Sequence, residues 1–399
     1  MIEISESNKA DCCGCTACAN ICPKNAITMK EDIEGFLYPT VDKEKCINCD
    51  LCKKVCPILN KKTQNENLKE AYVIRVKDEN VLQTSTSGGF FTPLATEVLN
   101  KNGIIIGVGY GEDWKVEHLI VIKENENILG QLRGSKYVQS YLGNIFSKIK
   151  NWLNENETVL FSGTPCQVYG LLIFLGKDYK NLITIDFVCH GVPSPKLWKK
   201  YVNYQEEKHK SKIKKVYFRN KTYGYHSGTM KIVFANNKEY YGSARVDYML
   251  KSFFSEISSR PSCYKCKFKD KNHISDFTIF DCWSASELVK DLNDDDDKGY
   301  TNLFVNTKKG EEILNNLKSE YVMYPVDIDK AIKLDGPMVE KSAVPHKNRK
   351  EFYKSLEKEG LEKTISTYIN VSLKDKSIEA MKKIMYKMNL LNKIKGLRK

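Results

Sequence analysis

The sequence predicts an α/β protein, α+β overall, with a small cysteine-rich domain, a larger mixed-sheet domain and a helical basic tail. Two features predict this class. Nine of the 14 cysteines fall between Cys12 and Cys56, and strand-like and helix-like segments alternate from Ala71 onward. The polar run at 60–67 has no apolar period, which is typical of a linker. The expected divisions are a domain at 1–60, a linker at 61–70, a sheet domain at 71–345 and a tail at 346–399.

The bulk composition is that of a globular chain. Its 399 residues exceed the usual domain size of about 100 to 200 residues, and 41% hydrophobic residues can supply a core. The N-terminus lacks a basic start followed by an apolar run, so we expect a cytoplasmic protein. The formal net charge of +13 comes mainly from lysines spread along the chain, which argues against a nucleic-acid site.

One cysteine pattern, C-x2-C-x2-C-x3-C-P, occurs twice near the N-terminus, ending at Pro23 and at Pro57. This spacing suits a 4Fe-4S cubane, because thiolates three residues apart on a tight loop can reach neighbouring irons. In two-cluster ferredoxins the cysteine before the proline ligates the other cluster. We therefore predict a bacterial-ferredoxin-like domain with one cluster on Cys12, Cys15, Cys18 and Cys56 and another on Cys46, Cys49, Cys52 and Cys22.

Zinc is the alternative for this region, since it also binds four thiolates from C-x2-C pairs. A zinc knuckle supplies two ligands, whereas each copy here has three and a proline-marked fourth, so the pattern favours iron-sulfur clusters. Cys13 lies outside the spacing and is expected to be a spare thiol. Interlocked ligands hold the clusters close together, and the predicted role is to pass single electrons between partners.

The region after the linker alternates between strands and helices. Apolar runs predict strands at 71–76, 104–108, 158–161 and 182–188, and helices at 90–100, 141–153, 167–175 and 195–205. Later strands at 215–219 and 230–234 are expected to form an antiparallel piece. The most apolar stretches are short or broken, so no membrane span is predicted.

Four cysteines of this region are candidates for a further metal site. Cys166 and Cys189 each follow a predicted strand, and the carboxyl edge of an α/β sheet is where ligands bind. Cys263 and Cys266 complete a set of four thiols. Spacing alone leaves a third cluster, a zinc site and four buried thiols open.

Several segments resemble the beta-subunit family of coenzyme F420 hydrogenases and dehydrogenases, over about residues 71–330. They are Thr86-Ser87-Gly88-Gly89, Arg133-Gly134-Ser135-Lys136-Tyr137-Val138, Gly163-Thr164-Pro165-Cys166-Gln167, Cys189-His190-Gly191-Val192-Pro193-Ser194 and Cys263-x2-Cys266. The resemblance implies FAD and a third 4Fe-4S cluster on Cys166, Cys189, Cys263 and Cys266.

The implied flavin contacts make chemical sense. Ser87, Gly88 and Gly89 open the helix from residue 90, where bare backbone N–H groups can meet the flavin diphosphate or ring. A second set of donors is suited to phosphate, although a basic surface turn is the plainer interpretation. This set is Arg133, Ser135 and Lys136.

Other residues carry weaker signals. Asp276, Asp281 and Trp283 resemble the family's aspartate-rich stretch, but Phe280 stands where a glycine is common, which puts a cofactor contact there in doubt. His190 is a weak candidate for proton transfer beside a flavin. The acidic run at 294–297 lacks ligand spacing and is expected to be a solvated loop, and Cys282 is expected to be buried and inert.

The tail carries apolar residues at helical spacing from Ile378 to Leu391, with lysines nearby. Such a helix can make peripheral contact with an anionic membrane, or dock on its own protein or a partner. For the whole chain we predict an iron-sulfur flavoprotein oxidoreductase that exchanges electrons with a soluble carrier or partner subunit and acts on a small hydride-accepting substrate. Two alternatives stay open: a non-catalytic electron-transfer subunit, and a nucleic-acid-binding protein with structural clusters.

Overall fold

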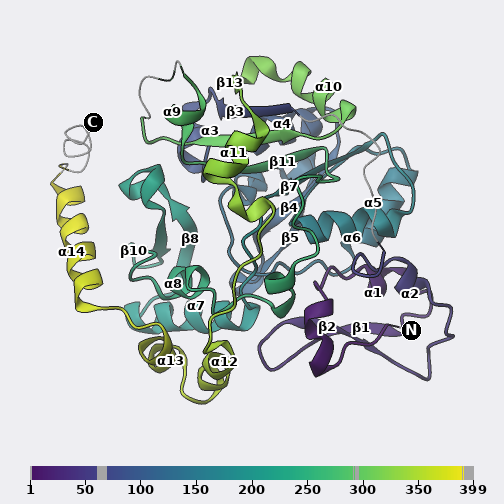
Figure 1. Cartoon of the computed structure of the whole chain (residues 1–399), viewed down its shortest axis with the longest axis horizontal. Helices are drawn as coiled ribbons and strands as arrows, with labels where there is room; N and C mark the ends of the chain where they lie inside the picture. The colour runs from purple at the N-terminus through teal and green to yellow at the C-terminus, as the bar shows by residue number, and fades with distance from the viewer. Residues whose placement is uncertain (1, 61–69, 291, 293–295, 389, 391–399) are drawn as a thin grey trace.

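The computed structural model describes residues 2–60, 70–290, 292, 296–388 and 390 (Figure 1). It is a mixed α/β structure with an N-terminal ferredoxin-like module, which confirms the predicted fold class. Most of the expected linker, Asp294, Asp295 and Leu391 lie outside the described residues.

An eight-stranded sheet forms the centre of the larger domain, in the order β13-β3-β12-β11-β7-β6-β4-β5. Four neighbouring strands, β11, β7, β6 and β4, are parallel, and antiparallel strands flank them on both sides. The bounds are β3 Glu70–Val76, β4 Ile104–Tyr110, β5 Val116–Val121, β6 Val159–Ser162, β7 Leu182–Phe187, β11 Phe277–Cys282, β12 Tyr300–Val305 and β13 Tyr321–Pro325. The four strands that the sequence predicts after the linker are therefore confirmed as β3, β4, β6 and β7.

Helices cover both faces of this sheet, because its strands are apolar on both sides. Alternate residues of β4 show the division: Ile105 packs with α4, whereas Ile104 and Ile106 pack with α5 and α6. The helices around the sheet are α3 Glu79–Thr84, α4 Phe91–Asn100, α5 Ile145–Asn154, α6 Pro165–Leu175, α9 Ala285–Leu288, α10 Lys308–Asn316 and α11 Ile328–Asp335.

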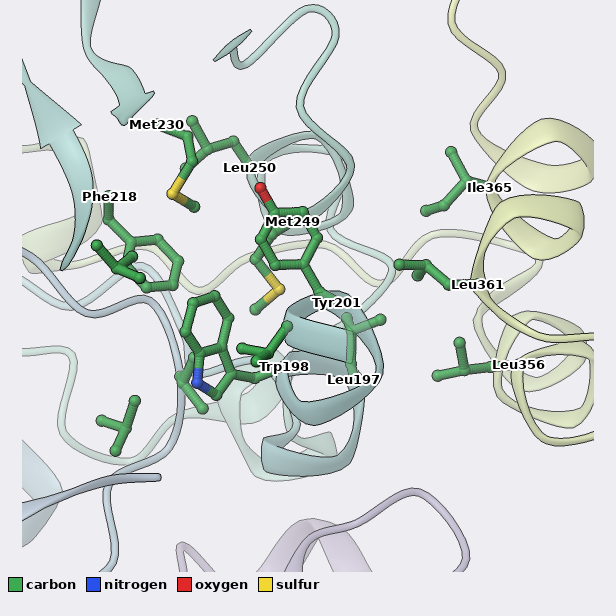
Figure 2. Close-up of a cluster of buried hydrophobic side chains, with 14 of the residues drawn as sticks. Leu197, Trp198, Tyr201, Phe218, Met230, Met249, Leu250, Leu356, Leu361 and Ile365 are labelled. Carbon is green, nitrogen blue, oxygen red and sulfur yellow. The ribbon is translucent and has the colours of Figure 1, made fainter. Parts of the chain in front are cut away.

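A smaller antiparallel sheet, β10-β9-β8, lies beside the main one. Its strands are β8 Ile213–Asn220, β9 Thr229–Phe234 and β10 Glu239–Ser243. Four helices pack around its core: α7 Pro195–His209, α8 Tyr248–Phe254, α12 Arg349–Lys358 and α13 Leu361–Tyr368. Figure 2 shows Leu356, Leu361 and Ile365 of α12 and α13 facing Leu197 and Tyr201 of α7. The first part of the expected tail is thus built into this core.

The last described helix, α14 Leu373–Lys387, lies beyond β10 at the left of Figure 1. It docks through Glu379, which is buried and accepts hydrogen bonds from the backbone N–H (3.1 Å) and hydroxyl (2.6 Å) of Ser243. Its apolar residues Leu373, Met381 and Ile384 are exposed. Docking on its own protein, one expected role, is therefore present, and contact with a membrane stays a prediction.

The N-terminal module comprises α1 Ala17–Ile21, β1 Ile27–Glu31, β2 Leu37–Val41 and α2 Leu51–Lys54. It lies below α5 and α6 at the lower right of Figure 1. Asn20 binds Ser147 of α5, and Glu34, in the turn between β1 and β2, binds Arg349 of α12. The module is thus held against both parts of the larger domain. Among the described residues, no helix combines the length and apolarity needed to span a bilayer.

Candidate metal centres and cofactor pocket

The module contains two pockets, each lined by a set of four cysteines that the sequence assigns to one cluster. One pocket is lined by Cys12, Cys15, Cys18 and Cys56, and the other by Cys22, Cys46, Cys49 and Cys52. Each set takes three thiols from one loop and a fourth from the other. The left-handed backbone of Thr16 (φ 65°) and Asp50 (φ 56°), one just before α1 and one just before α2, turns both loops in the same way.

The chemistry of these thiols fits a bound iron-sulfur cluster. Loss of water on burial raises the pKa of Cys18 to about 12, so its thiol would stay protonated at neutral pH without a cation. A bound metal overrides this effect, because a coordinating thiol is deprotonated outright. The Ala26 N–H donates to the Cys22 sulfur at 3.2 Å, and hydrogen bonds to ligand sulfur are among the factors that set the potential of a bound cluster. In the described part of the chain, no three His, Cys, Asp or Glu side chains are grouped to hold a single metal ion.

The four cysteines of the larger domain line a third pocket together. Cys166 begins α6 directly after β6, and Cys189 follows β7, so parallel pairing brings both to the carboxyl edge of the sheet. Cys263 and Cys266 come from the short helix η6 (Pro261–Lys265) and the residue after it. Burial raises the pKa of Cys189 to about 12 and that of Cys266 to about 11, so this donor set also requires a cation to ionise at neutral pH.

Cys13 lies between two of these pockets. It lines both the pocket of Cys12 and the pocket of Cys166, and its thiol is within hydrogen-bonding reach of Cys15 and Cys166. The sequence predicts a spare thiol here. The structure places this thiol where the module and the larger domain meet.

A cavity of about 920 Å³ opens at the carboxyl edge of the parallel strands. It is lined by Val108 of β4, Ser162 of β6, Phe187 of β7 and Asp281 of β11. This is the edge where ligands of open α/β sheets bind, and the volume is at the upper end for a small-molecule site. The cavity therefore has room for a large organic cofactor.

The segment before α4 forms one wall of this cavity. Ser87 and Gly89 line the cavity, and the Ser87 hydroxyl lies 2.8 Å from Thr301 Oγ1. Gly88 departs from the expectation of a bare N–H group, because its N–H donates to Thr301 Oγ1 at 2.8 Å. A Cβ at Gly88 would fall 2.3 Å from the carbonyl oxygen of Ile74. Gly88 thus shapes the turn by close packing on the sheet, and its N–H is not available to a phosphate.

The expected phosphate donors line the cavity beside the Ser87 segment. Arg133 donates to the hydroxyls of Thr92 (3.1 Å) and Thr84 (2.8 Å), and Ser135 N–H donates to Thr86. Lys136 Nζ donates to the carbonyl oxygens of Gln131 (2.6 Å) and Arg133 (2.8 Å). These contacts hold the loop in place.

Gly134, at φ 79°, has open space where a Cβ would stand, with only Thr86 Oγ1 near at 3.8 Å. Loss of water lowers the pKa of Lys136 to about 7, and no carboxylate of the described chain pairs with it. A loop with a cation in need of a counter-charge and an open backbone fits an anionic cofactor group.

His190 lies in the wall between the large cavity and the third cysteine pocket, and it lines both. Its Nε2 is 2.5 Å from Glu256 Oε1, and its ring packs edge-on against Phe253 at 4.9 Å. The same wall contains Cys189. A cofactor in the cavity and a cluster in the pocket would therefore be neighbours.

The two aspartates of the resemblance have different surroundings. Asp281 lines the cavity and pairs with Arg219, whose guanidinium lies 4.6 Å from the Trp283 ring. Asp276 is buried in the sheet and accepts hydrogen bonds from Thr184, so it is structural.

Phe280 packs on Phe304 at 5.1 Å, and both Phe280 and Asp281 line the cavity. Of the acidic run, Asp296 pairs with Arg75 at 2.8 Å, and Asp297 accepts the His226 N–H at 3.0 Å. Cys282 is buried, as expected.

Sequence reasoning missed three residues of these sites: Thr301, Arg219 and Arg260. Thr301 and Arg219 come from β12 and β8, and no local pattern connects them with the segments that they contact. Arg260 lies three residues before Cys263, and that closeness to a proposed ligand is the one signal that the sequence offers.

Comparisons with known proteins match two separate parts of the chain. Residues 156–331 match the family model for the C terminus of the beta subunit of coenzyme F420 hydrogenase/dehydrogenase, and residues 11–59 match the 4Fe-4S dicluster domain. The F subunit of the F420H2 dehydrogenase of Methanosarcina mazei is 23% identical over 190 residues, which are 45% of this chain and 53% of that protein. The chain thus spans about half the length of this relative.

Two further relatives cover other parts. An uncharacterized ferredoxin of Methanocaldococcus jannaschii is 35% identical over 71 residues, which are 16% of this chain and 91% of the ferredoxin. A chain of the xenon-derivatised F420-reducing [NiFe] hydrogenase complex from Methanosarcina barkeri aligns with 71% of this chain and 91% of its own length. The identity is 18% and the TM-score 0.43.

Proposed function

Because residues 156–331 match the C terminus of the coenzyme F420 hydrogenase/dehydrogenase beta subunit and residues 11–59 match the 4Fe-4S dicluster domain, we propose that the chain is an iron-sulfur flavoprotein oxidoreductase. In this proposal, electrons pass between three clusters and a flavin in the large cavity. A small substrate or coenzyme that accepts a hydride, F420 or another, exchanges electrons with the flavin.

The observation that carries the proposal is the order of the pockets. The cavity shares Cys189 and His190 with the third cysteine pocket, which in turn shares Cys13 and Ile58 with the pocket of Cys12. Cys18 and Cys52, from the two module pockets, pack in one small core. The pockets therefore form a line from the cavity to the far side of the module, as an electron relay requires.

The residues around the cavity have distinct proposed roles. Ser87, Gly89, Ser135 and Lys136 would hold the flavin, whose chemistry when bound is to exchange one or two electrons. Gly88 and Thr301 would position the Ser87 turn, and Arg133 would fix the adjoining loop. His190 lines the cavity and is held at Nε2 by Glu256, and it is the proposed proton-transfer residue.

The proposed partners are a soluble electron carrier or another redox subunit on the module side, and a small molecule at the cavity. The module supports the first, because its pocket of Cys46 includes the exposed Cys49. A cytoplasmic setting is part of the proposal, since 12 of the 14 cysteines are proposed cluster ligands and need a reducing compartment.

The deciding experiment is iron and acid-labile sulfide per chain on protein purified without oxygen. About 12 irons are expected for three 4Fe-4S clusters, and about 8 would confine the clusters to the module. The double variant Cys263→Ser with Cys266→Ser should lose about four irons. Cys282→Ser is the matched control, because Cys282 packs in the core of β11 and β12.

Flavin content and hydride transfer separate this proposal from a purely electron-carrying subunit. We expect the purified chain to retain or rebind FAD and to reduce a small hydride acceptor. A chain that holds its clusters and passes electrons but binds no flavin and turns over no acceptor would be the non-catalytic subunit instead.

A further inference from the structure

Arg260 is a fully buried cation at the junction of the module and the larger domain, with 0% of its surface exposed. Its Nε donates to the Cys12 carbonyl at 2.8 Å, and its Nη1 donates to Gln139 Oε1 at 2.9 Å. Its Nη2 donates to the Leu37 carbonyl at 3.0 Å and lies 3.6 Å from the Cys12 sulfur. The guanidinium also stacks on Tyr38, at 4.1 Å.

None of the contacts recorded for Arg260 in the described chain is with a carboxylate. The two other deeply placed arginines have one each: Arg219 pairs with Asp281, and Arg349 pairs with Glu34. A buried charge is costly unless another charge compensates it. Carbonyls and one amide satisfy the N–H groups of Arg260, but they leave its positive charge without a partner of opposite sign.

The groups around Arg260 indicate where that counter-charge comes from. Cys12 is a proposed ligand of the first cluster, and Arg260 also lines the pocket of Cys166, Cys189, Cys263 and Cys266. Both sites would carry thiolates on an iron-sulfur cluster. The guanidinium is thus placed between two anionic groups, and it cannot lose its proton in a protein.

The cysteine loop is also shaped for this contact. Gly14 has φ 72°, and a Cβ there would fall 2.6 Å from Gln139 Nε2 and 3.0 Å from Arg260 Nη1. Gln139 in turn donates to the Cys13 carbonyl at 3.2 Å. A larger residue at position 14 would displace the guanidinium from the Cys12 loop.

We propose that Arg260 is the shared counter-cation of the first and third clusters and raises their reduction potentials. The inference rests on the proposed function, because it requires both clusters. Reduction adds one electron and no proton to a cluster, so its charge becomes more negative by one. A fixed positive charge beside the sulfur ligands stabilises that reduced form, and net charge and hydrogen bonds to sulfur are known determinants of cluster potential.

The test is a redox titration followed by EPR on anaerobically purified full-length chain. Arg260→Gln removes the charge, and we expect the midpoint potential of at least one cluster to shift downward with iron content unchanged. Arg260→Lys keeps the charge but loses the planar donor set, so a smaller downward shift is expected.

Arg349→Gln is the matched control. Arg349 is also a buried arginine that docks the module, with Nη1 and Nη2 at 2.9 and 2.6 Å from the two Glu34 oxygens, but it contacts no cysteine among the recorded bonds. The cluster potentials of the Arg349→Gln variant should equal those of the protein without substitutions. A drop of the same size in both variants would assign the effect to module docking and overturn the proposal.

Unchanged potentials in Arg260→Gln would also overturn it. If Arg260→Gln fails to assemble its clusters, Arg260→Met is the second variant that removes the charge, and potentials equal to those of the unchanged protein would overturn the proposal. If the chain without substitutions contains only about 8 irons, the proposed function loses its third cluster. If the chain contains about 12 irons and the cluster potentials do not shift in Arg260→Gln, the three-cluster electron relay is retained and only the proposed role of Arg260 is wrong.

Discussion

The thiols of Cys13 and Cys166 lie within hydrogen-bonding reach of each other, although one belongs to the module and the other to the larger domain. This contact places the first and third cysteine pockets back to back. It also explains why Cys13 is buried rather than left on the surface.

Cys13→Ala should leave the iron content unchanged. The three-residue spacing runs through Cys12, Cys15 and Cys18, so Cys13 is not needed as a ligand. Cys12→Ala, its neighbour and control, should lose about four irons. If Cys13→Ala instead lost a cluster, the ligand assignment of this loop would be wrong.

Binding of an anionic cofactor should take up a proton near neutral pH. The pKa of Lys136 in the folded chain is lowered to about 7 by loss of water, and a nearby phosphate would raise it again. Cofactor affinity should therefore decrease as the pH rises above about 7, because binding then requires protonation of Lys136.

Calorimetry of FAD binding in buffers with different ionisation enthalpies measures this proton uptake. Lys136→Met should bind more weakly and without pH-dependent uptake. In the absence of cofactor, the stability of the fold should change with pH in the opposite direction to cofactor affinity. Between about pH 7 and 10.5 the Lys136 side chain is protonated in the unfolded chain and neutral in the folded one, so the free energy of unfolding should rise with pH across that window. Equal proton uptake by both proteins would exclude Lys136 as the responsible group.

Thr301→Val should weaken both the fold and the cofactor site. The hydroxyl accepts the Gly88 N–H and lies 2.8 Å from the Ser87 hydroxyl, so its loss leaves a buried donor without a partner. The expected cost is about 1 to 3 kcal/mol in the free energy of unfolding, together with weaker flavin binding. Thr367→Val, on the exposed side of α13, is the control and should change neither measurement. Wild-type stability and affinity in Thr301→Val would show that the Ser87 turn does not depend on β12.

Local pattern was enough to predict much of the fold, for physical reasons. Apolar runs such as 104–108 can be buried on both sides only in a central strand, and they became β4 and its neighbours. The repeated cysteine spacing predicts three thiols of each module pocket, because one tight loop carries them, and the fourth follows from the crossing of ligands in two-cluster ferredoxins.

Contacts between distant segments could not be predicted in this way. Gly88 seemed a free donor because its partner, Thr301, lies in a strand far along the chain. Arg260 carried no pattern of its own, since its partners Cys12, Leu37 and Gln139 come from three separate segments. In both places the sequence misses a side chain whose hydrogen-bonding partners belong to distant segments of the chain.

The docking of α14 should depend on one buried carboxylate. Glu379 accepts two hydrogen bonds from Ser243 inside the protein, whereas Leu373 and Met381 are exposed and Tyr386 packs edge-on against Tyr223 at 5.6 Å near the end of the helix. Glu379→Ala should release α14, which hydrogen exchange and limited proteolysis before residue 373 would detect. Glu379→Gln keeps an acceptor of the same shape and should preserve most of the protection from exchange.

Release of α14 should also affect the large cavity, because Asp375 and Lys382 of this helix line it. We expect one side of the cavity to open, which should weaken substrate binding more than it lowers cluster content. Unchanged exchange rates in Glu379→Ala would mean that the remaining contacts of α14 hold it without the carboxylate.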